Sequence, residues 1–496
     1  MDDHGDATQD DRDLIRIGKR PVLKRNFGFM SILGFSCTVL ITWEGMLIVS
    51  TQSLVNGGPA GLIWGFLIVW VGTLSTFAVL SELASIFSNA RCSWVAMLAP
   101  DSARRFLSYI TGWLALIGWQ AVTASAAYLI GSLLQSVIIL TKPDYTPQPW
   151  QTMLFVWAIL AFSVFINTVA SKTLAYFESV ILFLHIFGFV GILISLVYLA
   201  PHGDGSLFTT FVNGGAWPTQ GLSFMVGLPV TVYSLIGADS AIHMSEEIKH
   251  ASTVVPHSVL ISVLLNGTLG FAMLLAYVFC LGDIDAVLES QDTLGYPFLF
   301  VFREGTGSIA GAAVMGLVVV ILGICSTVGV LAATSRMLWS FARDRGIPFC
   351  SIVAHPYLPI YTVIVTTTVS VLLSLITLGS TVAFNNIVNL SVAGLYPSYF
   401  ISCVLLLWRR LQHQGIRPHD TQVEKLGPNN LHWGPWRIPG KLGVLNNIFA
   451  CSTPVTPESM NYSVLTFGAT VLFAVLWYFL RGRKFYHGPI VEVEQE

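Results

Sequence analysis

The sequence predicts an all-α integral membrane protein whose helices cross the bilayer about eleven times. Of its 496 residues, 54% are hydrophobic and only 10% are charged, and the mean hydropathy is +0.70. Soluble domains carry about 25% charged residues, so most of this chain must face lipid or other apolar side chains. Two apolar spans, at about 27–51 and 222–244, are interrupted by polar residues at corresponding places. They predict two inverted repeats of five spans each, over 27–200 and 222–408.

The individual spans follow from windows of roughly 20 apolar residues, the length that crosses a bilayer. In the first repeat they cover about 27–51, 62–87, 106–140, 150–166 and 174–199. In the second repeat they cover about 222–244, 258–281, 309–342, 361–378 and 387–408. A polar linker at 409–461 precedes a final span at 462–480, and charged tails are expected at 1–25 and 481–496.

The distribution of Lys and Arg predicts a cytoplasmic N-terminus. The chain begins with acidic residues, unlike a cleaved signal peptide, so the first span should direct insertion. Of the first 22 Lys and Arg residues, all but Lys142 and Arg303 then fall on the cytoplasmic side, as the positive-inside rule requires. The basic residues at 481–484 fall on that side after twelve spans but not after eleven. The sequence at 443–454 begins like a span and stops, so we interpret it as the remnant of a missing eleventh span.

The two interruptions are the most informative feature of the chain. The first is Thr42-Trp-Glu-Gly45, and the second, centred on Asp239, comes 195 residues after Glu44. A carboxylate at bilayer depth costs several kcal/mol unless it faces protein or a water-filled cavity. Unwound backbone is tolerated at that depth only where it is buried in protein or lines a cavity. We therefore expect the first and sixth helices to be broken around a solute site, with the third and eighth helices completing its wall.

The candidate substrate-binding residues lie at these breaks or offer an aromatic face to them. They are Thr42, Trp43, Glu44, Gly45, Trp119, Tyr233, Ser234, Ile236, Gly237 and Asp239. Broken helix ends offer N–H groups suited to a carboxylate, whereas Glu44 would attract an amine, and each aromatic face adds about 0.5–2 kcal/mol for a cation. Two alternatives stay open: Glu44 pairs with a polar group on another helix, and Asp239 caps backbone amides or binds a coupling ion.

Other polar residues within spans allow two interpretations each. His185, in the middle of the fifth span, is either a proton relay or a core histidine bonded to a neighbouring carbonyl. His243, Glu246 and Glu247 follow the second break and suit a gate that pairs with Arg or Lys, in preference to a substrate site. The hydroxyls at 326–327 could ligate sodium, but a packed helix interface is the favoured account.

Several kinds of chemistry find no support. The chain has no phosphate-binding loop, no G-x-S-x-G elbow and no H-E-x-x-H pair, so ATP-driven pumping and hydrolysis are not indicated. Its seven Cys residues are scattered and match neither a disulfide framework nor a metal site. We expect no metal, no cofactor, no nucleic-acid partner and no enzymatic activity.

A group of short motifs resembles one family of membrane proteins. The motifs are Phe35-Ser-Cys-Thr, Thr42-Trp-Glu-Gly45, Gly57-Gly-Pro-Ala-Gly61, Glu82-Leu-Ala-Ser85, Met97-Leu-Ala-Pro100, Ile242-His-Met-Ser-Glu-Glu247, Gly295-Tyr-Pro-Phe298, Ser335-Arg336, Phe341-Ala-Arg-Asp344 and Pro454-Val-Thr-Pro-Glu-Ser-Met-Asn-Tyr462. Together they resemble the amino acid–polyamine–organocation superfamily, and within it the fungal-type amino acid, GABA and choline permeases. The resemblance covers nearly the whole chain outside its termini.

The resemblance implies a leucine-transporter-type fold of five plus five spans, in which the first and sixth helices unwind around the substrate. Two features depart from the family pattern: the linker at 88–94 is short and lacks a Gly pair and a Tyr, and the eleventh span is missing. Both look like internal deletions. The missing span lies outside the two repeats, so the core fold is expected to survive.

These observations predict a secondary transporter that works by alternating access. Its expected substrate is a small amine-bearing solute such as an amino acid, GABA or choline, its coupling ion a proton, and its location the plasma membrane. The alternatives are a nutrient receptor on the same fold, a membrane-embedded enzyme, and a truncated form that does not transport.

Overall fold

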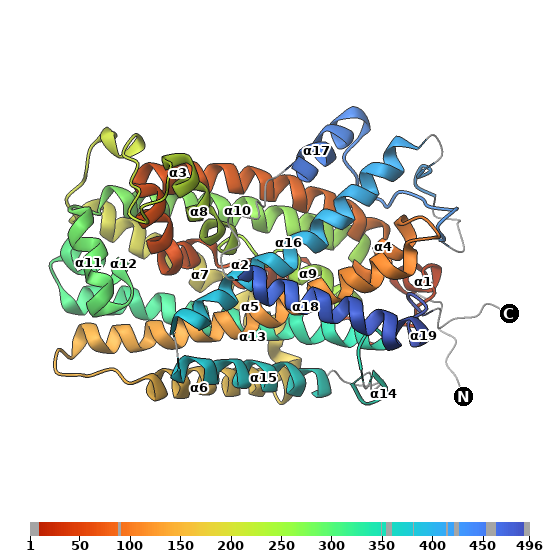
Figure 1. Ribbon diagram of the computed structural model, residues 1–496, viewed down its shortest axis with the longest axis horizontal. Helices are drawn as coiled ribbons and strands as arrows, with labels where there is room; N and C mark the ends of the chain where they lie inside the picture. The colour runs from red at the N-terminus through yellow and green to blue at the C-terminus, as the bar shows by residue number, and fades with distance from the viewer. Residues whose placement is uncertain are drawn as a thin grey trace.

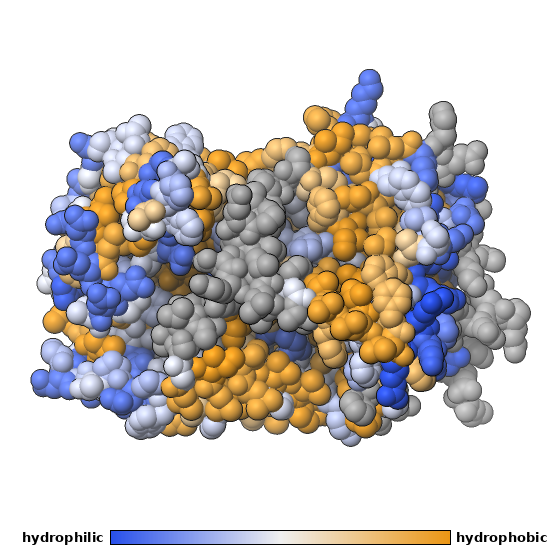
Figure 2. All heavy atoms as spheres, viewed as in Figure 1, coloured by the Kyte–Doolittle hydropathy of each residue, from blue (hydrophilic) through white to orange (hydrophobic). Residues whose placement is uncertain are grey.

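The regular secondary structure of this protein is helical. The computed structural model describes residues 9–87, 91–348, 350–353, 360–379, 381–412, 415–420, 426–452 and 463–490. Long helices lie side by side along the longest dimension (Figure 1). Figure 2 shows a broad hydrophobic surface across the middle and hydrophilic residues gathered at both ends. Eight helical stretches in the described ranges are long and apolar enough to cross a membrane, so the chain is an integral membrane protein.

The first span is broken, but not at the residues expected. Helix α2 (Phe29–Leu40) ends at Ile41, which adopts a left-handed conformation with φ 30° and ψ 49°, and α3 (Thr42–Ile86) begins directly after it. The expected break at 42–45 is therefore wrong by a few residues, because these residues form the first turn of α3. The physical reason is Glu44, whose negative charge in a first turn favours a helix N-terminus.

The connection between the first and second expected spans is a kink within α3. Gly58 has φ 66° and ψ −169°, a conformation that side chains rarely allow, and Pro59 follows it. The Ala60 N–H donates to the Thr210 carbonyl at 3.1 Å. A Cβ atom at Gly58 would lie 2.8 Å from that same carbonyl oxygen, so the loop that precedes α8 packs directly on the kink.

The next three long helices agree with the expected spans. After the short α4 (Arg91–Leu98) come α5 (Arg104–Thr141), α6 (Pro149–Thr168) and α7 (Leu174–Leu199). Pro149 occupies the first turn of α6, where its missing N–H does no harm. The linker at 88–94 is expected to be shortened, and its residues 88–90 lie outside those described.

The sixth span is broken where the sequence predicts. Helix α8 (Gln220–Tyr233) is capped by Thr219, whose side chain accepts from the Leu222 N–H at 3.1 Å. It ends before a non-helical segment at 234–239, and the short α9 (Ser240–His243) follows. A 3₁₀ turn then leads to α10 (Ala251–Phe279).

The second half continues with helices close to the expected bounds. The stretch between the expected spans at 258–281 and 309–342 forms two helices, α11 (Ile284–Leu294) and α12 (Pro297–Thr306). The further helices are α13 (Ile309–Arg343), α14 (Cys350–Val353), α15 (Ile360–Ser374) and α16 (Thr381–Leu411). In the most apolar window of α13, 72% of residues are buried, against 22% in α6, so α13 lies in the interior and α6 faces lipid.

The C-terminal part contains a helix too short to cross a bilayer. α17 (Gly440–Ser452) has 13 residues, about 20 Å of helix, where a bilayer core requires about 30 Å. The residues that follow it, 453–462, lie outside those described. The last helices are α18 (Ser463–Trp477), a π-helical turn at Tyr478–Gly482, and α19 (Arg483–Phe485).

The first and last described helices lie at one end of the molecule. The N-terminal α1 (Gln9–Arg16) and α19 share one end of the bundle (Figure 1). The Asp344 carboxylate binds the Lys19 ammonium at 2.6 Å and the Ile490 N–H at 3.1 Å. The basic residues at 481–484 therefore lie on the side of the N-terminal segment. The number of spans and the division into two repeats of five stay predictions.

Candidate functional site

A cavity of about 50 Å³ lies between the two helix breaks. Residues around Ile41 form one side, the end of α8 and the segment after it form another, and α5 and α13 complete the wall. The lining residues are Val39, Leu40, Ile41, Gly45, Ile48, Val49, Val122, Ala126, Leu129, Ile130, Tyr233, Ser234, Ile236, Gly323, Ser326 and Val330. The cavity thus has the walls that the sequence predicts.

The two breaks approach each other closely at glycine positions. A Cβ atom at Gly45 would lie 3.6 Å from the Cβ of Ser234. Gly237 has φ 123°, and a Cβ atom there would lie only 3.0 Å from Cγ1 of Val39. Glycine is required at the second position both for this conformation and for the close contact.

At both breaks, some backbone N–H and carbonyl groups make no backbone hydrogen bond with the described residues. The Gly45 N–H donates to the Ile41 carbonyl at 2.7 Å. The N–H groups of the three residues before it, 42–44, make no backbone hydrogen bond within the described parts of the chain, as expected for a helix start. On the opposite side, the carbonyl oxygens at 234–236 accept none from the described residues. Donors for an anionic group and acceptors for an amine thus lie beside one cavity.

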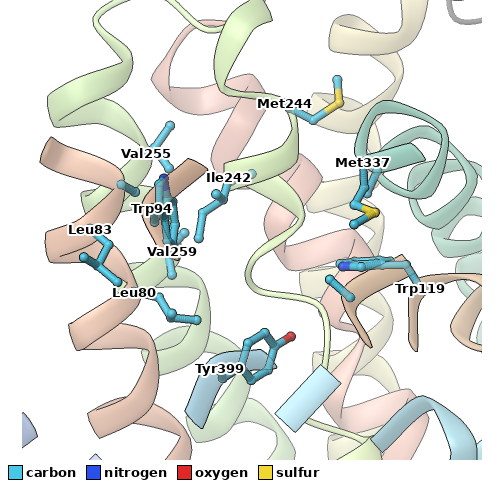
Figure 3. Close-up of a cluster of buried hydrophobic side chains, with 14 of the residues drawn as sticks. Leu80, Leu83, Trp94, Trp119, Ile242, Met244, Val255, Val259, Met337 and Tyr399 are labelled. Atoms are coloured by element: carbon cyan, nitrogen blue, oxygen red, sulfur yellow. The ribbon is translucent and has the colours of Figure 1, made fainter. Parts of the chain in front are cut away.

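Asp239 connects the second break to two other helices. Its Oδ1 accepts from the Tyr399 hydroxyl at 2.9 Å, and its Oδ2 accepts from Trp119 Nε1 at 3.2 Å. His243 Nε2 lies 3.4 Å from the same Oδ2. In Figure 3 the Tyr399 hydroxyl points toward the unwound ribbon, and Met337 lies over the Trp119 ring. The fully buried Asp239 side chain therefore holds the break against α5 and α16.

Glu44 points away from the cavity and binds His185. Glu44 Oε1 and His185 Nδ1 are 2.7 Å apart, and both side chains are completely buried. Glu44 Oε2 and His185 Nε2 have no hydrogen-bond partner among the described residues. This contact joins α3 to α7. It corresponds to the alternative in which Glu44 pairs with a polar group on another helix.

The remaining substrate-site candidates divide into two groups. Tyr233 lines the cavity and its hydroxyl lies 2.9 Å from Ser125 Oγ, while the Ser234 hydroxyl donates to the Thr231 carbonyl at 2.7 Å. Trp43 instead packs on α7, with its ring centroid 5.8 Å from that of His185. Thr42 faces α10, where a Cβ atom at Gly270 would meet its methyl group. Of the ten candidates, the four that line the cavity are Gly45, Tyr233, Ser234 and Ile236.

Two of the three gate candidates form ion pairs with α13. Arg336 Nε binds Glu247 Oε1 at 2.9 Å, and Arg343 Nη1 binds Glu246 Oε2 at 3.0 Å. The third candidate, His243, contacts Asp239, with its ring edge-on to Trp119 at 5.5 Å. The ion pairs join the segment after the second break to the C-terminal half of α13.

Sequence reasoning missed a buried carboxyl on α7, that of Glu178. Glu178 is fully buried between α2 and α13: a Cβ atom at Gly34 would meet its carbonyl oxygen, and one at Gly329 would lie 3.5 Å from its Oε1. Its position was visible as the one acidic residue within an apolar span of 26 residues. It shares the buried face of α7 with His185, two helical turns away. Two titratable groups therefore border the first span.

The described residues contain no group of three or more His, Cys, Asp or Glu side chains that could hold a metal ion. The polar groups described above are instead paired with one another or left beside the cavity. This arrangement suits the binding of a small molecule through hydrogen bonds.

Comparisons with known proteins give the same family throughout. The profile of a family described as amino acid permease matches residues 27–476. A putative amino acid/polyamine transporter of Macrophomina phaseolina is 28% identical over 87% of this chain and 96% of its own length. The choline transporter of Saccharomyces cerevisiae is 26% identical over 96% of this chain and 84% of its own. Amino-acid permease 2 of Neurospora crassa is 26% identical over 97% and 89%, respectively.

Proposed function

Because this chain belongs to the amino acid permease family, we infer that it is a secondary transporter that carries an amino acid, choline or a related amine across a membrane. Its relatives include a choline transporter and an amino-acid permease. The single observation that carries the proposal is the cavity between the two helix breaks, where leftover N–H and carbonyl groups lie together.

The solute should bind between the helix start at 42–45 and the unwound segment at 234–237. A carboxylate suits the free N–H groups of the first, and an amine suits the carbonyl oxygens of the second. Tyr233 offers the one aromatic side chain of the cavity wall, which suits a cation at about 0.5–2 kcal/mol. Trp43, Glu44, Trp119 and Asp239 would then act from behind this wall by holding the breaks in place.

The cavity must widen before a solute can enter. Its volume of about 50 Å³ is far below the roughly 300–1,000 Å³ of ligand pockets. The ion pairs Arg336–Glu247 and Arg343–Glu246 close the end beyond the second break. We therefore assign them to a gate that opens as α2, α8 and α9 move against α5 and α13, giving alternating access.

We propose that the coupling ion is a proton and that the Glu44–His185 pair receives it. A buried pair at 2.7 Å changes its charge when a proton arrives, and this changes the attraction between α3 and α7. Since Glu44 lies in the first turn of α3 and the next residue, Gly45, lines the cavity, such a change would alter the solute site.

The proposed location is the plasma membrane, with both chain ends in the cytoplasm. The shared end of α1 and α19 (Figure 1) carries the basic residues at 481–484. This agrees with the positive-inside rule. Accessibility of tags placed at both ends, measured in sealed cells, tests the orientation.

The proposed transport is tested by uptake into reconstituted vesicles. The full chain is supplied with radiolabelled choline, GABA, a polyamine and neutral amino acids, with and without an inward proton gradient. We expect accumulation of at least one of these solutes, driven by the proton gradient and insensitive to sodium. Equal counts in protein-free vesicles for the whole panel would refute transport of these solutes, and a sodium requirement would refute proton coupling.

A further inference from the structure

A second, larger cavity lies at the end of the bundle that carries α1 and α19. Its volume is about 580 Å³. It lies between the end of α13, the short α14, the start of α5 and the turn that follows α18. The side chains that matter for its chemistry are Tyr109, Arg343, Arg345, Trp477, Arg481 and Phe485. None of them belongs to the solute cavity.

The charge of this cavity is positive. Arg343 binds Glu246, but Arg345 and Arg481 form no ion pair with any residue in the described parts of the chain. The neighbouring Asp344 does not compensate them, because it is buried and holds Lys19 and the Ile490 N–H. Two cationic groups are thus left for an anion.

Two further groups suit an anion with oxygen atoms. Tyr109 lines the cavity, its side chain is 1% exposed, and its hydroxyl has no hydrogen-bond partner among the described residues. The Arg481 guanidinium lies 5.9 Å from the Trp477 ring centroid and 5.7 Å from that of Phe485. These rings restrict the position of the guanidinium but do not accept its N–H donors. The N–H donors therefore stay available for a bidentate contact with a phosphate.

The outer side of the cavity continues into a lipid-facing surface. On α18 and the turn after it, Leu476 is 51%, Phe479 62% and Leu480 73% exposed. These apolar side chains directly precede Arg481, so the boundary between acyl chains and headgroups falls at the cavity mouth. A lipid with an anionic headgroup fits this position, since its acyl chains can lie on α18 while the headgroup enters the cavity.

We propose that this cavity is a binding site for the headgroup of an anionic phospholipid. Basic pockets between transmembrane helices on the cytoplasmic side are suited to such headgroups. Arg345 and Arg481 would bind the phosphate, the Tyr109 hydroxyl would donate to one of its oxygen atoms, and Trp477 and Phe485 would border the headgroup. The site is independent of the solute cavity and does not rest on the proposed substrate.

The test uses the purified full chain in a neutral detergent, with thermal unfolding followed as short-chain ligands are added. The ligands are dioctanoyl phosphatidylinositol 4-phosphate, dioctanoyl phosphatidylcholine and inositol 1,4-bisphosphate. We expect the first to raise the unfolding temperature by several degrees at saturation, through preferential binding to the folded state, and the other two to leave it nearly unchanged. An equal shift with phosphatidylcholine would overturn the anionic site. An equal shift with the soluble phosphate would overturn a lipid as its ligand.

Paired substitutions test whether the inositol lipid binds in this cavity. Arg345→Gln with Arg481→Gln should weaken the affinity for the inositol lipid about thirtyfold, because each basic group near a membrane surface contributes about fivefold. The matched control is Arg483→Gln with Lys484→Gln, two basic residues of the same segment outside the cavity wall, which should keep the wild-type affinity. Equal losses in both pairs would show non-specific attraction and refute the site. If the first pair does not fold, Tyr109→Phe decides: it keeps the buried ring and should weaken affinity severalfold, and an unchanged affinity would refute the proposal.

Discussion

Glu44 Oε1 and His185 Nδ1 lie 2.7 Å apart in the interior of the protein, although 141 residues separate them in the chain. The contact fastens the start of α3 to the middle of α7. Gly45, the residue after Glu44, lines the solute cavity, whereas Glu44 and His185 do not. The pair therefore lies directly behind the wall of the solute site.

Removing either partner of this pair should destabilise the protein, and removing both should cost less than the two single losses added together. Removal of one partner from a buried ion pair costs about 3–5 kcal/mol, because the other is left unpaired. We expect Glu44→Gln and His185→Gln each to lower the unfolding temperature in detergent, and the double variant to lose less than the sum of the two. A double variant whose loss equals that sum would show that the two side chains do not interact.

The same histidine should be required for coupling but not for movement of the solute. In His185→Gln vesicles we expect solute exchange between two compartments to persist while accumulation against a gradient disappears, since no proton binds at this position. The measurement is counterflow compared with uptake driven by a proton gradient. His257→Gln is the matched control, because His257 is exposed on α10; among the described residues it hydrogen-bonds to the Thr253 carbonyl of its own helix and lies edge-on to Trp436. Proton-driven accumulation in His185→Gln at the wild-type level would contradict the assignment.

Tyr399→Phe should loosen the second break. The hydroxyl donates to Asp239 at 2.9 Å, and a hydrogen bond to a charged group contributes about 1.5–3 kcal/mol. We expect a lower unfolding temperature together with reduced uptake. Tyr198→Phe serves as control, since this tyrosine is 85% exposed on α7 and its hydroxyl should contribute little. The prediction is wrong if both variants behave alike.

Side-chain size at Gly45 should control access to the cavity. A Cβ atom there would stand 3.6 Å from Ser234, an ordinary contact, so Gly45→Ala should fold and transport smaller solutes. Gly45→Leu would fill much of a cavity of about 50 Å³ and should reduce uptake by more than about tenfold, as a single methylene can in a close-fitting pocket. Initial uptake rates measure the effect. Gly191→Leu is the control, because a Cβ atom at Gly191 has no neighbour within 4 Å; wild-type uptake by Gly45→Leu would place the solute elsewhere.

Most of the helices could be predicted from the sequence alone. Apolar windows are a local property, so the bounds of α7 agree with the expected span to the residue and those of α13 to within one. The second break was also visible, because Gly237 and Asp239 interrupt an apolar run. The first break was displaced to Ile41, since the polar residues after it suit a helix start as well as a loop. The missing eleventh span stays a prediction, with α17 as the part of it that the described residues contain.

What the sequence by itself determined is therefore the membrane class, the family, the second helix break, and the first break to within a few residues. Only the tertiary structure decided the partners: Glu44 with His185, Asp239 with Tyr399, and Glu247 with Arg336. It also decided that Gly45 and Ser234 line the cavity whereas Trp43 packs on α7. The physical reason is that hydropathy is summed along one helix, whereas the partner of a buried polar group depends on which other helix packs against it and at what height.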